Sequence, residues 1–326
     1  MRIVSITHAS DIDGVGSAAL IKMRYGMDSS NAFFTDYSLA SLRYVHDSIR
    51  KIASREKDVM LFLTDLGMNR VLVREYESML KAVKARGWKV VWFDHHVWGE
   101  AEVRRIAGLC DLAIVGENPL YCATEITQKN LRVPGRFAAS FVRLVHYSDF
   151  NRRPRDSGTG RMIGIYAMSI TSYNNLGSFA RRNGALRHMV DVIAGGRYSD
   201  GRIAEDARAF QRLNDARIGK MLKGLVKVGE DACLGFSESV QSTRGCAAIM
   251  ERTGADICIC IDMVRSKASV RSRKADCTLL AASFGGGGHP HAAGFPVDSR
   301  RFGRLTVEGN RKRLAEHISR RIAELY

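Results

Sequence analysis

Hydrophobic residues in the first third of the chain follow two alternating patterns. Short runs with apolar, often β-branched residues at every second position are each followed by a longer stretch with apolar residues three or four positions apart. A period of two is typical of a strand, and a period near 3.6 is typical of a helix. The predicted strands cover residues 2–7, 31–35, 59–64, 89–93 and 112–115, and the predicted helices between them cover 14–25, 39–53, 71–86 and 99–106.

This alternation of strands and helices indicates β-α-β units, and therefore an α/β fold with a doubly wound parallel sheet. A helical pattern follows at 137–147, and residues 158–196 carry a mixed pattern with several glycines. A long amphipathic stretch at 203–226 predicts a connector helix. The shorter elements after it predict a smaller α/β domain, with strands at 233–236, 257–263 and 268–273 and helices at 243–252, 276–283 and 308–325.

The length of 326 residues agrees with two domains. We expect an N-terminal domain over residues 1–200, the connector helix over 201–228 and a C-terminal domain over 229–326. Hydrophobic residues make up 45% of the chain and charged residues 26%, which excludes disorder as its main character.

Neither the apolar runs nor the cysteines indicate a membrane or a secreted protein. No run approaches the ~18–20 apolar residues that cross a bilayer, and residues 1–7 lack a basic-then-apolar leader. Seven cysteines are scattered without a C-x-x-C pair, so we interpret them as buried apolar residues in a reducing compartment. We expect a cytoplasmic protein with no membrane partner.

The balance of charge points to an acidic partner. The formal net charge is +16 and the pI is about 9.8, values that suit a nucleic-acid-binding surface. Membrane surfaces and acidic small molecules also attract basic proteins, so charge alone does not choose among them. The basic segment 152–155 has two interpretations, a solvated surface or a phosphate contact.

Acidic side chains stand where the predicted strands end. The carboxyl ends of parallel strands form one edge of the sheet, so residues that follow them should converge. Several adjacent carboxylates raise one another's pKa, and divalent cations relieve that repulsion. Carboxylates mixed with imidazoles suit Mn²⁺, Zn²⁺ or Fe²⁺ better than Ca²⁺. The strand-end residues are Asp11, Asp13, Asp36, Asp65 and Asp94, the last followed by His95 and His96.

The alternative is that each aspartate caps the helix that follows it. One or two could do so, but five strand-end sites with two adjacent histidines favour a metal site. A second unusual segment is the glycine run at 285–288, followed by His289. Four glycines in succession carry an entropic cost. They indicate either backbone N–H groups close to an anion or a flexible loop.

These segments resemble the motifs of the DHH phosphoesterases. The sequence HASDIDG at 8–14, TDLG at 64–67, DHH at 94–96 and Asp149 are similar to the four successive motifs of that family. The segment GGGGHPHAAG at 285–294 resembles the glycine-rich signature of the DHH-associated C-terminal domain, and SVRS at 269–272 resembles a strand that precedes it. The resemblance covers nearly the whole chain.

The resemblance implies a site for two divalent metals, usually Mn²⁺, with Mg²⁺ or Co²⁺ as alternatives. One metal would be bound by Asp11 and Asp65 and the other by Asp13, Asp65, His95 and Asp149, so that Asp65 bridges them. His8 is a further candidate ligand; it precedes Asp11 by three residues, where many relatives have a spacing of two or four. His96 would face the scissile phosphate, with Asp94 supporting the imidazoles. The substrate contacts implied in the C-terminal domain are Arg271, Ser272, Gly286, Gly287, Gly288 and His289.

The function that the resemblance implies is a metal-dependent phosphodiesterase for single-stranded or short nucleic acid, like the oligoribonucleases and RecJ-like exonucleases of the family. Hydrolysis of small phosphates, such as cyclic dinucleotides or nucleoside bisphosphates, is the alternative within the enzymes. A non-catalytic replication partner is the alternative outside them. A homodimer or replication and repair proteins are the expected protein partners.

Overall fold

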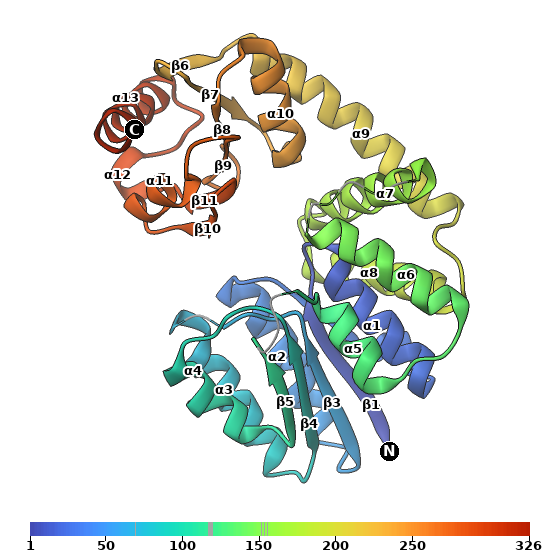
Figure 1. The fold of residues 1–326 in the computed structure, drawn as a ribbon. Helices are drawn as coiled ribbons and strands as arrows, with labels where there is room; N and C mark the ends of the chain where they lie inside the picture. Colours follow the sequence, from blue (N-terminus) through green and yellow to red (C-terminus); the bar gives the residue numbers. More distant parts are fainter. Residues whose placement is uncertain (69, 117–119, 151, 153, 155) are drawn as a thin grey trace. The chain divides into compact units, whose positions relative to one another are not determined.

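The computed structural model describes residues 1–326 except 69, 117–119, 151, 153 and 155 (Figure 1). Arg153 and Arg155 of the basic segment 152–155 therefore lie outside the described residues. The chain divides into two compact units, Met1–Arg208 and Ala209–Tyr326. The boundary falls inside helix α9 (Gly201–Leu222), so this helix contributes to both units.

A five-stranded sheet forms the centre of the first unit. Its strand order is β2-β1-β3-β4-β5, and every neighbouring pair is parallel. The doubly wound parallel sheet predicted from the sequence is thus confirmed. The order reverses between β1 and β3, which is where such sheets bind ligands. The strands are β1 (Arg2–His8), β2 (Ala32–Thr35), β3 (Val59–Thr64), β4 (Lys89–Asp94) and β5 (Leu112–Val115).

Helices cover both faces of this sheet, because alternate strand residues are apolar on each side. Val4 and Ile6 of β1 pack into one core, and Ile3 packs into the other. The first core receives α2 (Leu39–Ala53), α3 (Arg70–Lys84) and α4 (Glu100–Ile106). The second receives α1 (Ile12–Tyr25), α5 (Ala123–Leu131), α6 (Arg136–Asp149), α7 (Ser157–Asn174) and α8 (Phe179–Ala194). The segment 158–196, whose pattern was mixed, thus supplies two helices.

The second unit is built on a mixed six-stranded sheet of order β10-β11-β9-β8-β7-β6. Only β7 and β8 pair in parallel. Its strands are β6 (Val226–Gly229), β7 (Ala232–Ser237), β8 (Ile257–Asp262), β9 (Lys267–Arg271), β10 (Gly287–His289) and β11 (Ala292–Pro296). Its helices, besides the end of α9, are α10 (Ser242–Thr253), α11 (Cys277–Ser283), α12 (Ser299–Phe302) and α13 (Glu308–Leu325). Together the units form the predicted two-domain α/β fold.

The cysteines lie where the sequence pattern predicts them. All seven are free, and six are buried. Cys258 and Cys260 project from one face of β8 into the core beneath α10, where they pack with Cys246 and Ile249. They serve as small apolar core residues.

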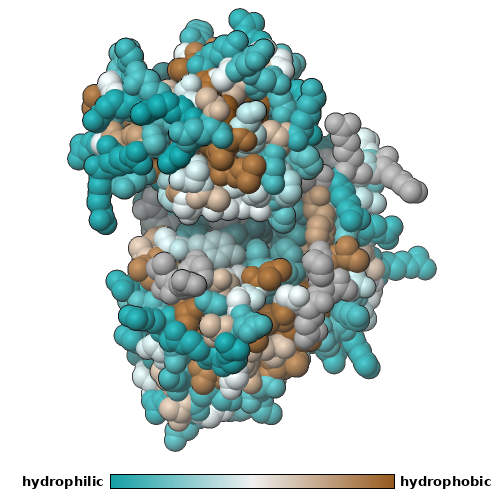
Figure 2. All heavy atoms as spheres, turned by 60° about the vertical axis from the view of Figure 1, so that its left-hand side comes forward, coloured by the Kyte–Doolittle hydropathy of each residue, from teal (hydrophilic) through white to brown (hydrophobic). Residues whose placement is uncertain are grey.

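Charged and polar side chains dominate the surface. Figure 2 shows a mostly hydrophilic second unit, with hydrophobic side chains exposed between the polar ones. No helix in the described part of the chain is both long enough and apolar enough to cross a bilayer.

Candidate metal centre

The pairing register of the first sheet brings the strand ends to one edge. His8 pairs with Thr35, and Thr64 pairs with both Thr7 and Phe93. Residues that follow these positions therefore emerge side by side, although up to about ninety residues separate them in the sequence. Three groups of ligand atoms lie there, each with its atoms within 4.8 Å of one another: His8, Asp11 and Asp65; Asp13, His95 and Asp149; and Asp65, His95 and His96.

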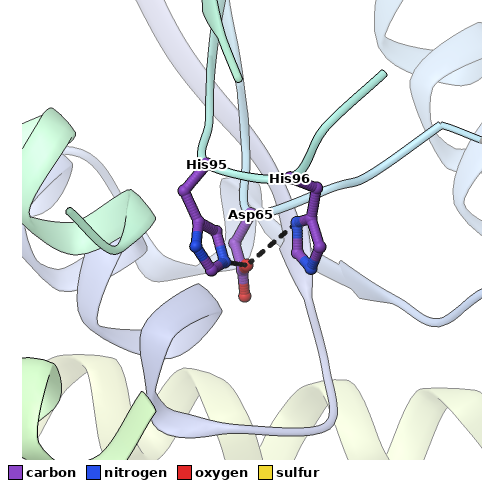
Figure 3. Close-up of side chains that lie close together, drawn as sticks. All are labelled: Asp65, His95 and His96. Atoms are coloured by element: carbon purple, nitrogen blue, oxygen red, sulfur yellow. Dashed lines mark ion pairs between the residues drawn. The ribbon is translucent and has the colours of Figure 1, made fainter. Parts of the chain in front are cut away.

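Asp65 lies between the other groups. Its Oδ2 atom is 3.5 Å from Nδ1 of His8, and its Oδ1 atom is 3.6 Å from Nε2 of His95. Oδ1 is also 3.9 Å from Nδ1 of His96, and Figure 3 shows the carboxylate between the two imidazole rings. The two oxygens of a single carboxylate thus face two different sets of donors.

The backbone of Asp65 is held in an uncommon conformation. Its φ of 56° is left-handed, and its N–H donates to the carbonyl of Phe93 on the neighbouring strand, with an N···O distance of 3.0 Å. Such backbone conformations cost energy, and after glycine it is aspartate and asparagine that tolerate them best. Strain of this kind is often found at functional sites. Here it turns the carboxylate toward the sheet edge.

Asp11 caps a helix and also lies in one of the groups of candidate ligands. Its Oδ1 caps α1 by accepting from the N–H groups of Asp13 and Gly14, at 3.1 and 3.3 Å. Its Oδ2 is 2.9 Å from Nδ1 of His8. Gly14 lets the first turn of α1 approach β1, because a Cβ there would lie 2.2 Å from the carbonyl oxygen of His8. The cap therefore fixes the carboxylate beside the imidazole.

Asp13 is oriented by the start of a distant helix. The N–H groups of Ala123 and Thr124, in the first turn of α5, each donate to one of its oxygens at 2.7 Å. The Thr124 hydroxyl donates to the Asp13 backbone carbonyl at 2.8 Å. Helix N-termini stabilise negative charge. The Oδ2 atom of Asp13 also lies 3.9 Å from Nε2 of His95.

His95 and His96 have different neighbours. Nδ1 of His95 is 3.8 Å from Oδ2 of Asp149, at the end of α6. Nδ1 of His96 is 2.8 Å from Oδ1 of the fully buried Asp94, whose Oδ2 accepts from the indole N–H of Trp98 at 2.7 Å. Asp94 therefore orients His96, and Trp98 orients Asp94.

The crowded carboxylates shift each other's pKa values. Burial, together with the charge of Asp65 and Asp149, raises the pKa of Asp13 well above its ordinary value. Burial and the charge of Asp11 likewise raise the pKa of Asp65, and burial is the main reason that the pKa of Asp149 rises to about 6. The metal-free site thus resists holding all of its carboxylates ionised.

At Asp11 and at the three imidazoles, attraction between opposite charges outweighs the effect of burial on the pKa. For Asp11, the cost of burial is outweighed by His8, so that its pKa is lowered. Burial lowers the pKa of His95, yet Asp65 and Asp13 outweigh it and raise that pKa to about 10. The pKa values of His8 and His96 are also raised, against the effect of burial, by Asp11 and Asp94 respectively. Protons on these imidazoles partly neutralise the acidic groups.

Asp36 does not join these groups, contrary to the expectation that all strand-end carboxylates converge. Its Oδ2 accepts from Nη1 of Arg182 on α8 at 2.6 Å, and Arg182 is only 5% exposed. None of the ligand groups among the described residues includes it. Asp36 instead forms a structural ion pair with Arg182, which lies 146 residues away in the sequence.

Tyr37 is a site neighbour that the sequence analysis missed. The N–H of Gly67 donates to its hydroxyl oxygen at 3.2 Å. Its ring centroid lies 5.1 Å from that of His8 and 6.4 Å from that of His96. Trp98 and the N-terminus of α5 were missed as well. Tyr37 follows a strand and Trp98 lies four residues after Asp94, so their positions in the sequence were a weak indication that they lie near the site. Nothing in the sequence indicated that the N-terminus of α5 does so.

In the second unit chain packing requires two glycines of the run, Gly286 and Gly288. Gly287 to His289 form β10, which pairs with β11. A Cβ at Gly286 would lie 2.1 Å from the carbonyl oxygen of Gly294, and a Cβ at Gly288, where φ is 146°, would lie 2.5 Å from the Cα of Ala293. These two glycines allow close approach to β11, whereas Gly287 has no atom within 4 Å of such a Cβ and is exposed.

The three other residues implied by the resemblance differ in exposure. His289 is exposed at the end of β10. Arg271 is partly buried and donates to the carbonyl of Val270 at 2.9 Å. Ser272 is 5% exposed, and its hydroxyl bonds to Asp256 while accepting from the N–H of Ala275. Ser272 therefore holds the turn that follows β9.

Solved structures show which fold this is, whereas no family model and no curated protein matches the sequence. RecJ from Thermus thermophilus, in complex with Mn²⁺, matches with a TM-score of 0.59 and 15% identity. An exopolyphosphatase-related protein from Bacteroides fragilis matches with a TM-score of 0.52 and 17% identity. The chain therefore shares the fold of these two proteins.

A third match is the pGpG-specific phosphodiesterase PggH from Vibrio cholerae, with a TM-score of 0.52 and 13% identity. The alignments cover 98% of this chain for RecJ and PggH and 99% for the exopolyphosphatase-related protein. They span 52% of RecJ, 93% of the exopolyphosphatase-related protein and 99% of PggH. The chain thus spans about half the length of RecJ.

Proposed function

We propose that this protein is a two-metal phosphodiesterase that hydrolyses short or single-stranded nucleic acid. The observation that carries the proposal is the position of the Asp65 carboxylate, with Oδ2 toward His8 and Oδ1 toward His95. A carboxylate that faces two donor sets suits a bridging ligand between two cations. The DHH fold and the net charge of +16 support the same conclusion.

The residues present fit divalent cations. Oδ2 of Asp65 is buried and accepts no hydrogen bond of normal geometry, and its ion pair with Nδ1 of His8 is long at 3.5 Å, so a metal ion beside it would satisfy this oxygen. Imidazole and carboxylate donors together suit Mn²⁺, the ion we propose first. His8, Asp11 and Asp65 would hold one ion, and Asp13, Asp65, His95 and Asp149 the other. Two such ions supply Lewis acidity and a water of lowered pKa beside the phosphodiester.

His96 has the features of a phosphate contact. An ionised carboxylate only accepts hydrogen bonds, so the Nδ1–H of His96 donates to Asp94 and the Nε2 position is left for the substrate. The raised pKa of His96 favours the imidazolium form, whose Nε2–H donates to a phosphate oxygen. Asp94 and Trp98 hold this ring in place, a task that requires rigid partners.

In the second unit we propose that Arg271 and His289 contact substrate phosphate, with the backbone of Gly286, Gly287 and Gly288 beside them. A guanidinium offers forked donors to phosphate. His289 and Gly287 are exposed and no packing contact requires glycine at Gly287, so this strand leaves room for an anion. The buried Ser272 takes no part in this proposal.

The direct test is hydrolysis with added Mn²⁺. RNA and DNA oligomers of about two to twenty nucleotides, labelled at either end, should yield product ladders that show polarity, sugar preference and length limit. EDTA should abolish the reaction and Mn²⁺ should restore it. If no phosphodiester is cleaved although two Mn²⁺ ions are bound, the non-catalytic alternative replaces this proposal.

A second candidate is an enzyme for dinucleotides alone. It is favoured by the alignment with PggH, which spans nearly the whole of that protein, whereas only about half of RecJ is matched. Linear and cyclic dinucleotides therefore belong in the same assay. If turnover is confined to dinucleotides and longer oligomers are not cut, this candidate displaces the longer substrates.

A further inference from the structure

A groove in the second unit runs along the edge of the sheet opposite to the glycine run. The strand order places β10 at one edge and β6 at the other. A hollow of 1290 Å³ lies between β6 and α13, lined among others by Lys227, Lys312 and Arg320. A hollow of 400 Å³ adjoins it at Gly224, Phe236 and Arg311, which line both. We call the two hollows together the β6 groove.

Basic side chains line the β6 groove on both sides. Lys227 projects from β6, and Lys312 and Arg320 project from α13; all three are exposed. Arg217 and Lys220, from the end of α9, line the smaller hollow. The acidic lining residues are Glu238, Glu308 and Glu316.

The acidic residues neutralise only part of this charge. Glu238 pairs with Lys220 at 3.5 Å. Among the described residues, no ion pair forms with Lys227, Lys312 or Arg320. The six basic residues of the two linings outnumber the three acidic ones, so the groove keeps an excess of positive charge beside the carboxylates of Glu308 and Glu316.

A guanidinium and an aromatic ring lie where the two hollows meet. The guanidinium carbon of Arg311 is 6.0 Å from the centroid of the Phe236 ring. Nη1 of Arg311 donates to the carbonyls of Leu305 and Thr306, each at 3.1 Å. These bonds fix the plane of the guanidinium. Nucleic-acid-binding proteins stack unpaired bases on aromatic rings and on guanidinium planes.

The size of the groove argues for an extended ligand. Small-molecule sites usually occupy about 300–1,000 Å³, and the larger hollow alone exceeds that range. A single nucleotide would leave it largely empty. An acidic peptide would satisfy the cations but would make no use of the Arg311–Phe236 pair, whereas a single strand supplies both phosphates and bases.

We propose that the β6 groove binds single-stranded nucleic acid, with phosphates beside Lys227, Lys312 and Arg320 and a base against the Arg311–Phe236 pair. The inference deepens the proposed function and rests on it for the view that the bound strand is substrate. The binding itself involves no metal ligand and no residue of the glycine run.

The test is fluorescence anisotropy with a labelled single strand of about twenty nucleotides, in EDTA so that no cleavage occurs. Each phosphate contact adds about −0.7 to the slope of log K against log salt. The variant Lys227→Gln/Lys312→Gln/Arg320→Gln should flatten the slope by about 2. Between 50 and 200 mM salt the wild type should then lose about 20-fold more affinity than the variant loses.

The matched control is Arg300→Gln/Arg301→Gln/Arg304→Gln, which removes three exposed cations of the same unit outside the groove. It should keep the slope of the wild type. Arg311→Lys, which keeps the charge but loses the plane, should weaken binding about fivefold or more. Thermal melts monitored by circular dichroism show whether each variant is folded.

Three results would overturn the proposal: the same slope for the groove variant and the wild type; equal loss in the groove and control variants; or displacement of the strand by poly-glutamate as readily as by an unlabelled strand. The last would assign the groove to acidic proteins. Because metal is absent throughout, none of these results bears on the two-metal site, which the cleavage of dinucleotides tests separately.

Discussion

Asp65→Asn is the substitution that separates catalysis from folding most clearly. Asparagine has the same shape and tolerates the left-handed φ of 56°, whereas alanine would be strained there. The metal-free protein should lose little stability, because burial and Asp11 already disfavour the charge of Asp65 and raise its pKa. The metal-bound protein should lose its bridging oxygen.

The size of the effect follows from the two donor sets that this carboxylate faces, 3.5 Å from His8 and 3.6 Å from His95. Each metal ion contributes several kcal/mol of transition-state stabilisation, and 1.36 kcal/mol corresponds to a tenfold change in rate. A loss of about 4 kcal/mol lowers kcat about 10³-fold. The assay is cleavage of a labelled dinucleotide at saturating Mn²⁺, with bound metal measured on the same sample.

Asp36→Asn is the matched control, since Asp36 also follows a strand but pairs with Arg182. It should keep kcat and two bound ions while losing about 1–3 kcal/mol of stability, because a buried guanidinium loses its charged partner. An Asp65→Asn protein that binds two Mn²⁺ ions tightly and keeps a tenth of the wild-type kcat would refute the bridging role.

Three further outcomes follow from the site. Gly14→Ala should disrupt metal binding, because its Cβ would lie 2.2 Å from the backbone oxygen of His8. Gly184→Ala on α8 should raise stability by about 0.5–1 kcal/mol, because the added Cβ would have no atom within 4 Å. Metal titration and thermal melts check both. Trp98→Phe removes the indole donor to the buried Asp94 and should lower kcat about tenfold or more with metal content unchanged, which steady-state kinetics and metal analysis together measure. Mn²⁺ affinity should fall as pH is lowered from about 8 to 6, because the raised pKa values leave protons on the site that the metal must displace. Calorimetry in buffers of different ionisation enthalpy should show that binding releases protons. Uptake of protons would contradict the ligand assignment.

The positions of the strand ends could be predicted from the sequence for two reasons. The alternating pattern of a strand is a local feature, and the carboxyl ends of parallel strands always form one edge of the sheet. They place Asp11, Asp65 and the pair His95 and His96 at one edge, where the structure has them. The same rule failed for Asp36. Its partner Arg182 lies on a helix that the mixed pattern of 158–196 concealed.

Long-range contacts account for what the sequence could not provide. The two α5 N–H groups that hold Asp13 come from 110 and 111 residues further along the chain, and nothing in their sequence marks them as partners of a carboxylate. The glycine run was interpreted as an anion contact or a flexible loop. The structure adds a third cause, the close approach of β11 at Gly286 and Gly288, which depends on tertiary pairing alone.

The central claim is that two divalent ions share the Asp65 carboxylate. Crystals grown with Mn²⁺ and measured near the manganese absorption edge would test it most directly. We expect two anomalous peaks about 3.5–4 Å apart, one beside His8 and Asp11 and the other beside Asp13, His95 and Asp149, with Asp65 between them. A single peak, or two peaks that Asp65 does not join, would contradict the account.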